Sequence, residues 1–166
     1  MTIIIGVDPG LQRTGWGIIV CKNNQLSYID CGVIQSNPKA PMAERLKALH
    51  EGISRAVDLH QPIEAAVEET FVNMNPASTL KLGQARGALL MSLSLAGLPI
   101  SEYSATMVKK SVVGTGHADK SQVAMMVKTL LPTSQAKGAD AADALAVALC
   151  HAHQRTVTQL TKRIYS

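Results

Sequence analysis

Four acidic residues lie where their side chains could share a cation. Asp8 follows the apolar run at residues 3–7, and Glu68 follows a shorter apolar run at residues 65–67. Both runs are predicted to be buried strands, so each acid stands where a strand ends. If the two strands are parallel neighbours, both carboxylates lie at the same edge of the sheet. Asp140 and Asp143 complete the set and are three residues apart in an alanine-rich segment.

Asp140 and Asp143 share one face of the first turn of a predicted helix at residues 139–153. The positive end of the helix dipole also favours two anions at this position. An acid pair at a helix start is common on its own, and an acid before Pro9 is typical of a turn. Four carboxylates gathered in one place, however, need either raised pKa values or bound cations. It is this combination that favours a functional site.

The predicted chemistry is metal-assisted hydrolysis of a phosphodiester. Ligand sets made only of oxygen favour Mg²⁺ or Mn²⁺ over zinc. Two such ions ~4 Å apart can activate a water molecule and stabilise the leaving oxygen. We therefore expect two Mg²⁺ ions per site, with Mn²⁺ as an alternative. Gly6 lies on the same side of its strand as Asp8 and is expected to leave room for an ion or a phosphate.

The elements that must position these acids begin with three strands. Their connections are too short for a crossover helix, so they are predicted to form an antiparallel meander. Helices and strands then alternate, which predicts an α/β fold with a five-stranded mixed sheet and helices on both faces. The predicted strands lie at residues 3–7, 14–20, 25–35, 65–67 and 100–103. The predicted helices lie at residues 42–60, 79–96 with Ser78 as N-cap, 106–113, 120–131 and 139–153.

The length of 166 residues suits a single domain. We place this domain at residues 1–155 and expect a flexible tail at residues 156–166. The most apolar window, residues 87–100, is shorter than the ~20 residues that span a bilayer, and the N-terminus does not resemble a signal peptide. The three cysteines are widely spaced, which argues against a disulfide framework and a structural zinc site. We therefore expect a cytoplasmic protein with no membrane segment.

The net charge of +4 is concentrated in the middle of the chain. Residues 1–70 carry −2, residues 71–138 carry +5, and residues 139–166 carry +1. Lys and Arg can neutralise phosphates while nearby carboxylates hold cations. A basic segment beside an acidic site therefore indicates an enzyme that acts on a polyanion.

The sequence resembles the RuvC family of bacterial crossover junction endodeoxyribonucleases between residues 3 and 153. The similarity rests on GVDPG with TGWG, AVEETF, LKLGQARG, VKKSVVGTG, ADKSQV and DAADALA, which occur in the family's order and spacing. The resemblance implies a ribonuclease H-like fold, a homodimer, and paired, symmetric nicking of four-way (Holliday) junctions in recombination and repair. It also implies RuvA and RuvB as branch-migration partners.

The resemblance implies roles for individual residues. Lys109 and Lys120 match basic residues that the family uses near the scissile phosphate or for DNA binding. Phe71 matches a loop aromatic that stacks within the junction, although the only Phe of the chain could instead belong to the core. The expected catalytic set is Asp8, Glu68, Lys120, Asp140 and Asp143, of which the four acids bind metal. The expected DNA-binding set is Phe71, Lys81, Arg86, Lys109, Lys110, His117 and Lys120.

The chain departs from the family pattern at two positions. Met74 stands where many relatives have Lys, which removes a contact from the loop to a phosphate. His117 stands where many have Arg, which makes one DNA contact weaker or pH-dependent. Some relatives also have His at the position of Asp140, so the division of work between Asp140 and Asp143 stays open.

Two other functions fit part of the pattern. A strand followed by G-x-D-x-G and a nearby Thr-Gly also forms the first phosphate loop of ATP-binding domains of the actin and sugar-kinase type. Those domains need a second lobe, which 166 residues cannot supply. A junction-binding module without catalysis would be favoured by the loss of one acid, and none of the four is missing. The helix at residues 79–96 is apolar on more than one face, so it is either central or shared with a second subunit.

Overall fold

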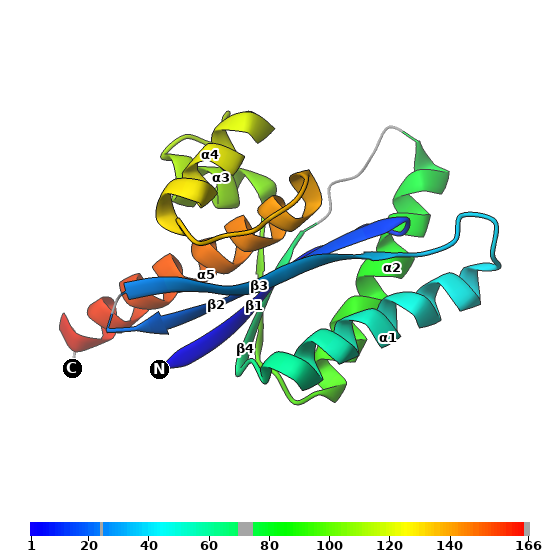
Figure 1. Cartoon of the computed structure of the whole chain (residues 1–166), viewed down its shortest axis with the longest axis horizontal. Helices are drawn as coiled ribbons and strands as arrows, with labels where there is room; N and C mark the ends of the chain where they lie inside the picture. The colour runs from blue at the N-terminus through cyan, green and yellow to red at the C-terminus, as the bar shows by residue number, and fades with distance from the viewer. Residues whose placement is uncertain (24, 70–74, 165–166) are drawn as a thin grey trace.

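A five-stranded mixed sheet separates two groups of helices (Figure 1). The computed structural model describes residues 1–23, 25–69 and 75–164, and side chains as far as Arg155. The strand order is β3-β2-β1-β4-β5, as expected of the predicted mixed sheet. The strands are β1 (Thr2–Asp8), β2 (Arg13–Lys22), β3 (Gln25–Gln35), β4 (Glu64–Glu68) and β5 (Ile100–Tyr103). The helices are α1 (Met42–His60), α2 (Pro76–Leu95), α3 (Ala105–Val113), α4 (Lys120–Leu130) and α5 (Ala139–Ile164).

The central strand β1 is antiparallel to β2 and parallel to β4. Strand β3 pairs antiparallel with β2, which confirms the predicted meander. Val7 pairs with Val67, so the next residue of each strand, Asp8 and Glu68, falls at the same edge of the sheet. The parallel pairing that the site required is therefore present.

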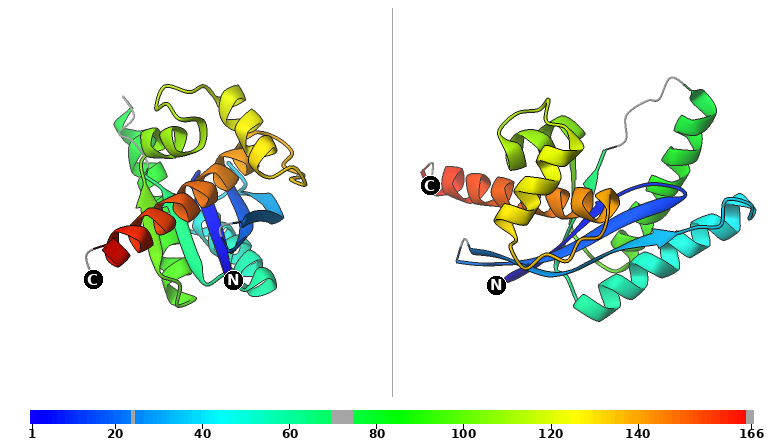
Figure 2. Two further views of the ribbon diagram at one scale, coloured as in Figure 1. Left: turned by 90° about the vertical axis from the view of Figure 1, so that its left-hand side faces the viewer. Right: turned by 45° about the horizontal axis from the view of Figure 1, so that its top comes forward.

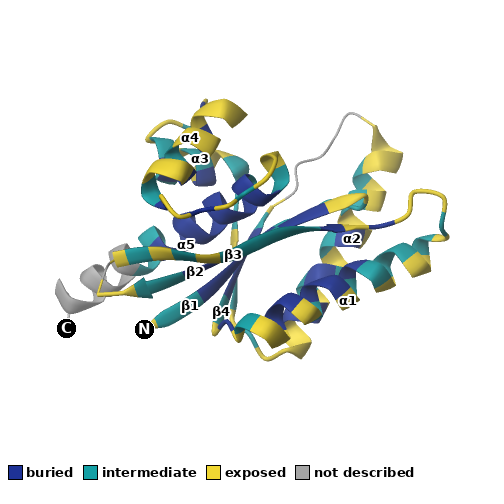
Figure 3. Cartoon of the chain, in the orientation of Figure 1, coloured by how far each residue is buried: buried dark blue, intermediate teal, exposed yellow. Residues whose placement is uncertain are grey.

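The two faces of the sheet carry separate apolar cores. Along β1, Ile5 and Val7 pack with α1 and α2, whereas Ile4 packs with α3, α4 and α5. This alternation follows from the period of two in a strand. Figure 2 shows α5 lying across the sheet on the face opposite α1 and α2. In Figure 3, buried residues run through the strands and the middle of α5, where Ala144–Cys150 are all fully buried.

Two helix boundaries differ from the prediction by more than one residue. Helix α2 begins at Pro76, because the Asn75 side chain accepts hydrogen bonds from the backbone nitrogens of Ala77 and Ser78. Asn as N-cap with Pro as first helical residue is a favourable start, and Ser78 is therefore inside the helix. Helix α5 extends past the predicted end at residue 153 to Ile164. The division into a domain at residues 1–155 and a flexible tail stays a prediction.

Within the described ranges, no helix combines the length and the apolar composition needed to cross a bilayer.

Candidate active site

Acidic and basic side chains meet in a pocket at the edge of the sheet. Asp8 from the end of β1, Glu68 from the end of β4 and Asp143 from the first turns of α5 line this pocket of about 180 Å³. Lys109 of α3 and Lys120 at the start of α4 also line it, and the rest of the wall is apolar. Three of the four predicted acids are thus brought together from segments far apart in the chain.

Glycines on β1 and β2 allow α5 to lie directly on the strands. A Cβ atom on Gly6 would lie 2.2 Å from the Ala144 carbonyl oxygen, and one on Gly15 would lie 2.0 Å from the Asp140 carbonyl oxygen. Side chains at these positions would therefore push the helix away. The expectation that Gly6 leaves room for an ion or a phosphate is wrong, because helix α5 fills that space. The close approach carries the two acids of α5 toward Asp8.

The electrostatics of the pocket favour a bound cation. Burial, followed by the nearby charges of Glu68 and Asp143, raises the pKa of Asp8 to about 7. Burial and the charge of Asp143 also raise the pKa of Glu68 to about 7, against the opposing effect of Lys109 and Lys120. The hydrogen bond and charge of Asp143 raise the pKa of Lys120, which stays protonated. A positive ion would favour the ionised form of both carboxyls.

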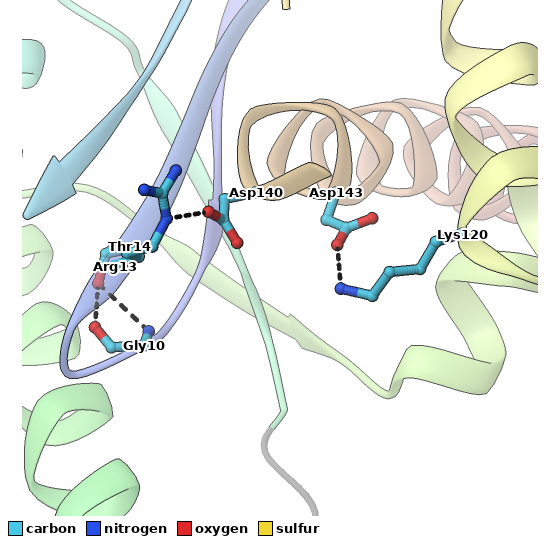
Figure 4. A network of polar contacts seen from close by, with 6 residues as sticks. All are labelled: Gly10, Arg13, Thr14, Lys120, Asp140 and Asp143. Carbon is cyan, nitrogen blue, oxygen red and sulfur yellow. Dashed lines mark hydrogen bonds and ion pairs between the residues drawn. The ribbon is translucent and has the colours of Figure 1, made fainter. Parts of the chain in front are cut away.

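Each of the two acids at the start of α5 has a basic partner (Figure 4). Asp143 Oδ2 lies 3.2 Å from the Lys120 Nζ. Asp140 Oδ2 lies 2.6 Å from the Arg13 Nε. The two acids extend in different directions, and Asp140 does not line the pocket that holds Asp143.

The donor set fits a hard divalent cation, because carboxylate oxygens are what Mg²⁺ and Mn²⁺ prefer. In the part of the chain that the structure describes, no three acidic, histidine or cysteine side chains lie close enough to hold a metal ion as they stand. Asp140 and Asp143 are instead paired with side-chain cations, and Asp8 and Glu68 have a pKa raised to about 7. Ion binding would draw these side chains together and compete with Lys120 and Arg13.

The family model described as crossover junction endodeoxyribonuclease RuvC matches residues 4–151 of this chain. The chain belongs to the RuvC family. Two curated RuvC relatives, from Paramagnetospirillum magneticum and Methylocella silvestris, are 61% and 57% identical to it. The alignments cover 96% and 98% of this chain, and 96% and 93% of the relatives.

Solved structures agree with this assignment. Thermus thermophilus RuvC in complex with a Holliday junction substrate has a TM-score of 0.86 and 32% identity, over 95% of this chain and 98% of that chain. The yeast mitochondrial Holliday junction resolvase Ydc2 has a TM-score of 0.69 at 11% identity, over 92% of this chain and 78% of that chain, and shares the fold alone. The ribonuclease H-like fold expected for a RuvC relative is confirmed.

The other residues expected to contact DNA in a RuvC relative lie in different settings. Lys81 of α2, Lys110 of α3 and His117 between α3 and α4 are exposed. Arg86 instead forms an ion pair with Glu102 of β5, and its Nε is buried without a hydrogen-bond partner in the described structure. A phosphate contact by Arg86 would have to replace this ion pair. Phe71 and Met74 lie outside the described residues.

Arg13 is the residue of the site that the sequence did not reveal. It lies beside the TGWG segment, but no motif marks it, and its partner is 127 positions away. The available signal was its place at the start of β2, since β2 pairs with β1 as far as Asp8 opposite Gly15. A basic side chain there is close to any acid at the end of β1.

Proposed function

We propose that this chain is a metal-dependent endonuclease that resolves four-way DNA (Holliday) junctions by paired, symmetric cleavage. One observation carries the proposal. In a member of the RuvC family, Asp8, Glu68 and Asp143 line a single pocket together with Lys109 and Lys120. Acids alone would suit any cation site, and lysines alone would suit any anion. Their combination suits a phosphodiester attacked in the presence of divalent cations.

Divalent ions, Mg²⁺ or Mn²⁺, would be held by Asp8, Glu68 and Asp143, with Asp140 beside them. Two bound ions would supply an activated water molecule and would stabilise the leaving oxygen. The apolar part of the pocket wall lowers the local dielectric constant and so strengthens the electrostatic interactions beside it. The acids themselves hold their negative charge at the end of the sheet, where the backbone is fixed by strand pairing and by α5.

Lys109 and Lys120 would bind the scissile phosphate. Lys120 is the first residue of α4, so its side chain extends from a helix whose start is held by a capping box between Asp119 and Gln122. An ammonium placed there orients a phosphate and offsets the charge that develops in the transition state. We assign Lys120 to catalysis. We assign Lys81, Lys110 and His117 to the DNA backbone and Phe71 to stacking on bases.

A homodimer suits the two-fold symmetry of a junction cut at two equivalent points. Helix α2 exposes Leu80, Met91 and Leu95, and an apolar groove lies between α1 and α2. Exposed apolar surface of this extent is typical of a subunit interface. RuvA and RuvB as partners rest on membership of the family, and a cytoplasmic location follows from action on the bacterial chromosome.

Cleavage of a synthetic four-way junction by the Asp8→Asn variant tests this function. Loss of the carboxylate removes a cation ligand, so we expect cleavage in Mg²⁺ to fall by about 10³-fold or more. Binding of the junction should persist, because the basic residues are untouched. Gel assays of cutting and of binding measure both. The matched control is Asp58→Asn on the exposed surface of α1, which should cut like the wild type. Undiminished cutting by Asp8→Asn would refute the proposal.

A further inference from the structure

Arg13 sets Asp140 apart from the other three acids. The 2.6 Å distance from its Nε to Asp140 Oδ2 is at the short end for a charge-assisted hydrogen bond. Arg13 is the first residue of β2, and Asp140 is the second residue of α5. Figure 4 shows Asp140 directed toward Arg13, and Asp143 directed toward Lys120.

The backbone beneath the Arg13–Asp140 pair is held by close packing. A Cβ atom on Gly15 would lie only 2.0 Å from the Asp140 carbonyl oxygen. Gly15 of β2 pairs with Asp8 of β1. Asp140 is therefore near the acid cluster, although its side chain does not line the pocket. Because the backbone is already in place, rotation of the side chain is what would bring the Asp140 carboxylate to the cluster.

The two basic partners hold their acids differently. Lys120 Nζ lies 3.2 Å from Asp143, and its side chain is 74% exposed. The Arg13 side chain is 48% exposed and makes the shorter contact. A planar guanidinium keeps a fixed geometry on a carboxylate, whereas an ammonium on a flexible chain exchanges readily with other charges. Asp143 is thus the more easily released of the two acids.

We propose, on the basis of the proposed nuclease function, that Arg13 is a positioning residue that withholds Asp140 from the acid cluster until a divalent ion displaces its guanidinium. The two ion sites are then unequal. The site built from Asp8, Glu68 and Asp143 binds its ion more tightly. The site on the Asp140 side binds more weakly because its ion must compete with Arg13. Binding of an ion to the weaker site is then the step that brings Asp140 to the other three acids.

Binding of Mn²⁺ alone to the full-length protein tests this inference. Electron paramagnetic resonance of free Mn²⁺ during a titration without DNA reports each class of site. We expect Arg13→Gln to tighten the weaker class by about fivefold, the scale of a partly exposed ion pair, and to leave the tighter class unchanged. Arg13→Lys keeps the charge but loses the fixed geometry of the guanidinium, so its weaker class should lie between the wild type and Arg13→Gln. Arg55→Gln, an exposed arginine of α1 on the other face of the sheet, is the matched control and should change neither class.

Other outcomes contradict the inference in distinct ways. If Arg13 only ties β2 to α5, Arg13→Gln lowers the melting temperature while both Mn²⁺ affinities keep their values. If the guanidinium instead orients Asp140 toward the ion, Arg13→Gln weakens Mn²⁺ binding. Asp140→Asn must remove the weaker class of Mn²⁺ site. If the double variant Asp140→Asn with Arg13→Gln binds Mn²⁺ more tightly than Asp140→Asn alone, the inference is also contradicted. Normal Mn²⁺ binding by Asp8→Asn would overturn the proposed metal chemistry itself. If Asp8→Asn loses Mn²⁺ binding but Arg13→Gln binds Mn²⁺ like the wild type, only the role of Arg13 is overturned.

Discussion

The charge state of individual side chains is set by a few contacts at the start and in the middle of α5. Near its start, burial and the surrounding negative charge raise the pKa of Asp8 and of Glu68 to about 7. Further along the helix, His151 Nε2 lies 2.8 Å from Glu64 Oε2, and its Nδ1 lies 2.8 Å from the Tyr103 hydroxyl. Arg155 Nε also pairs with Glu64 at 2.5 Å. An ionised carboxylate only accepts hydrogen bonds, so Nε2 carries a proton. The lowered pKa of His151 favours the neutral imidazole, in which Nδ1 accepts from the Tyr103 hydroxyl.

The burial of His151 predicts that this residue destabilises the fold in mild acid. Burial lowers the pKa of the His151 imidazole, although Glu64 acts in the opposite direction and Arg155 adds to the lowering. Just below the ordinary histidine pKa of about 6.5, His151 therefore binds fewer protons in the folded protein than in the unfolded chain. Its contribution to the free energy of unfolding falls as the pH drops through that window, whereas Asp8 and Glu68, whose pKa values are raised to about 7, contribute in the opposite direction.

Thermal denaturation followed by circular dichroism at about pH 7.5 and about pH 5.5 measures this effect. Because the destabilising group is gone, we expect the change in melting temperature between these two pH values to be more favourable to stability in His151→Gln than in the wild type. His117→Gln removes an exposed histidine and should behave like the wild type. An equal change in wild type and His151→Gln would mean that His151 does not contribute to the acid sensitivity.

At the scale of elements, the site depends on how closely α5 approaches the sheet. Gly6, Gly15 and Gly17 present bare backbone to it, and a Cβ on Gly17 would lie 2.7 Å from the Leu145 Cδ2 atom. Small residues on both surfaces let the axis of the helix lie near the strands, which places Asp143 beside Asp8. The helix therefore supports the site and also supplies Asp143 and Ala146 to its wall.

Substitution of Gly6 by Ala should disrupt this support. The new methyl group would meet the backbone at Ala144 and Ala148, which cannot move aside as a side-chain end can. We expect a loss of about 2–4 kcal/mol of stability and a marked fall in cleavage. Chemical denaturation measures the first effect and junction cleavage the second. Gly83→Ala on α2, where nothing lies within 4 Å, is the matched control and should gain about 0.5–1 kcal/mol. Equal stability of Gly6→Ala and wild type would mean that α5 shifts without cost.

Local patterns predicted the elements and the acids, but not the contacts made across long separations. Short apolar runs marked β1 and β4, and their parallel pairing brought Asp8 and Glu68 together as expected. The pairing of Asp140 with Arg13 depends on the packing of α5 on β2, which no local pattern carries. The start of α2 was misplaced because Asn75 and Ser78 are both good capping residues, and only the structure shows that Asn75 is used. Gly6 was correctly placed on the same face of the strand as Asp8, but the space beside it is filled by helix α5.

At the scale of the whole molecule, the two faces of the sheet carry different surfaces. Helices α3 and α4 lie on the same face as α5, where Lys109 and Lys120 line the acidic pocket and Lys110 is exposed on α3. The other face is covered by α1 and α2, where large apolar side chains are exposed. Under the proposed function, a polyanion would approach over α3 and α4 while a second subunit would occupy α2.

The salt dependence of junction binding tests this division of the surface. Each phosphate neutralised by a lysine releases counterions, so the slope of log affinity against log salt concentration counts the contacts. With Asp8→Asn as background to keep the DNA intact, Lys110→Gln should weaken binding and reduce the slope by about one. Lys22→Gln is the matched control, because Lys22 is the last residue of β2 and lies at the end of the β1–β2 pair that is far from Asp8. This variant should leave the slope unchanged. A shallower slope in Lys22→Gln, or an unchanged one in Lys110→Gln, would mean that DNA does not approach over α3. Fluorescence anisotropy of a labelled junction separates these cases, because the slope reports the number of charges engaged and does not depend on how strongly each one binds.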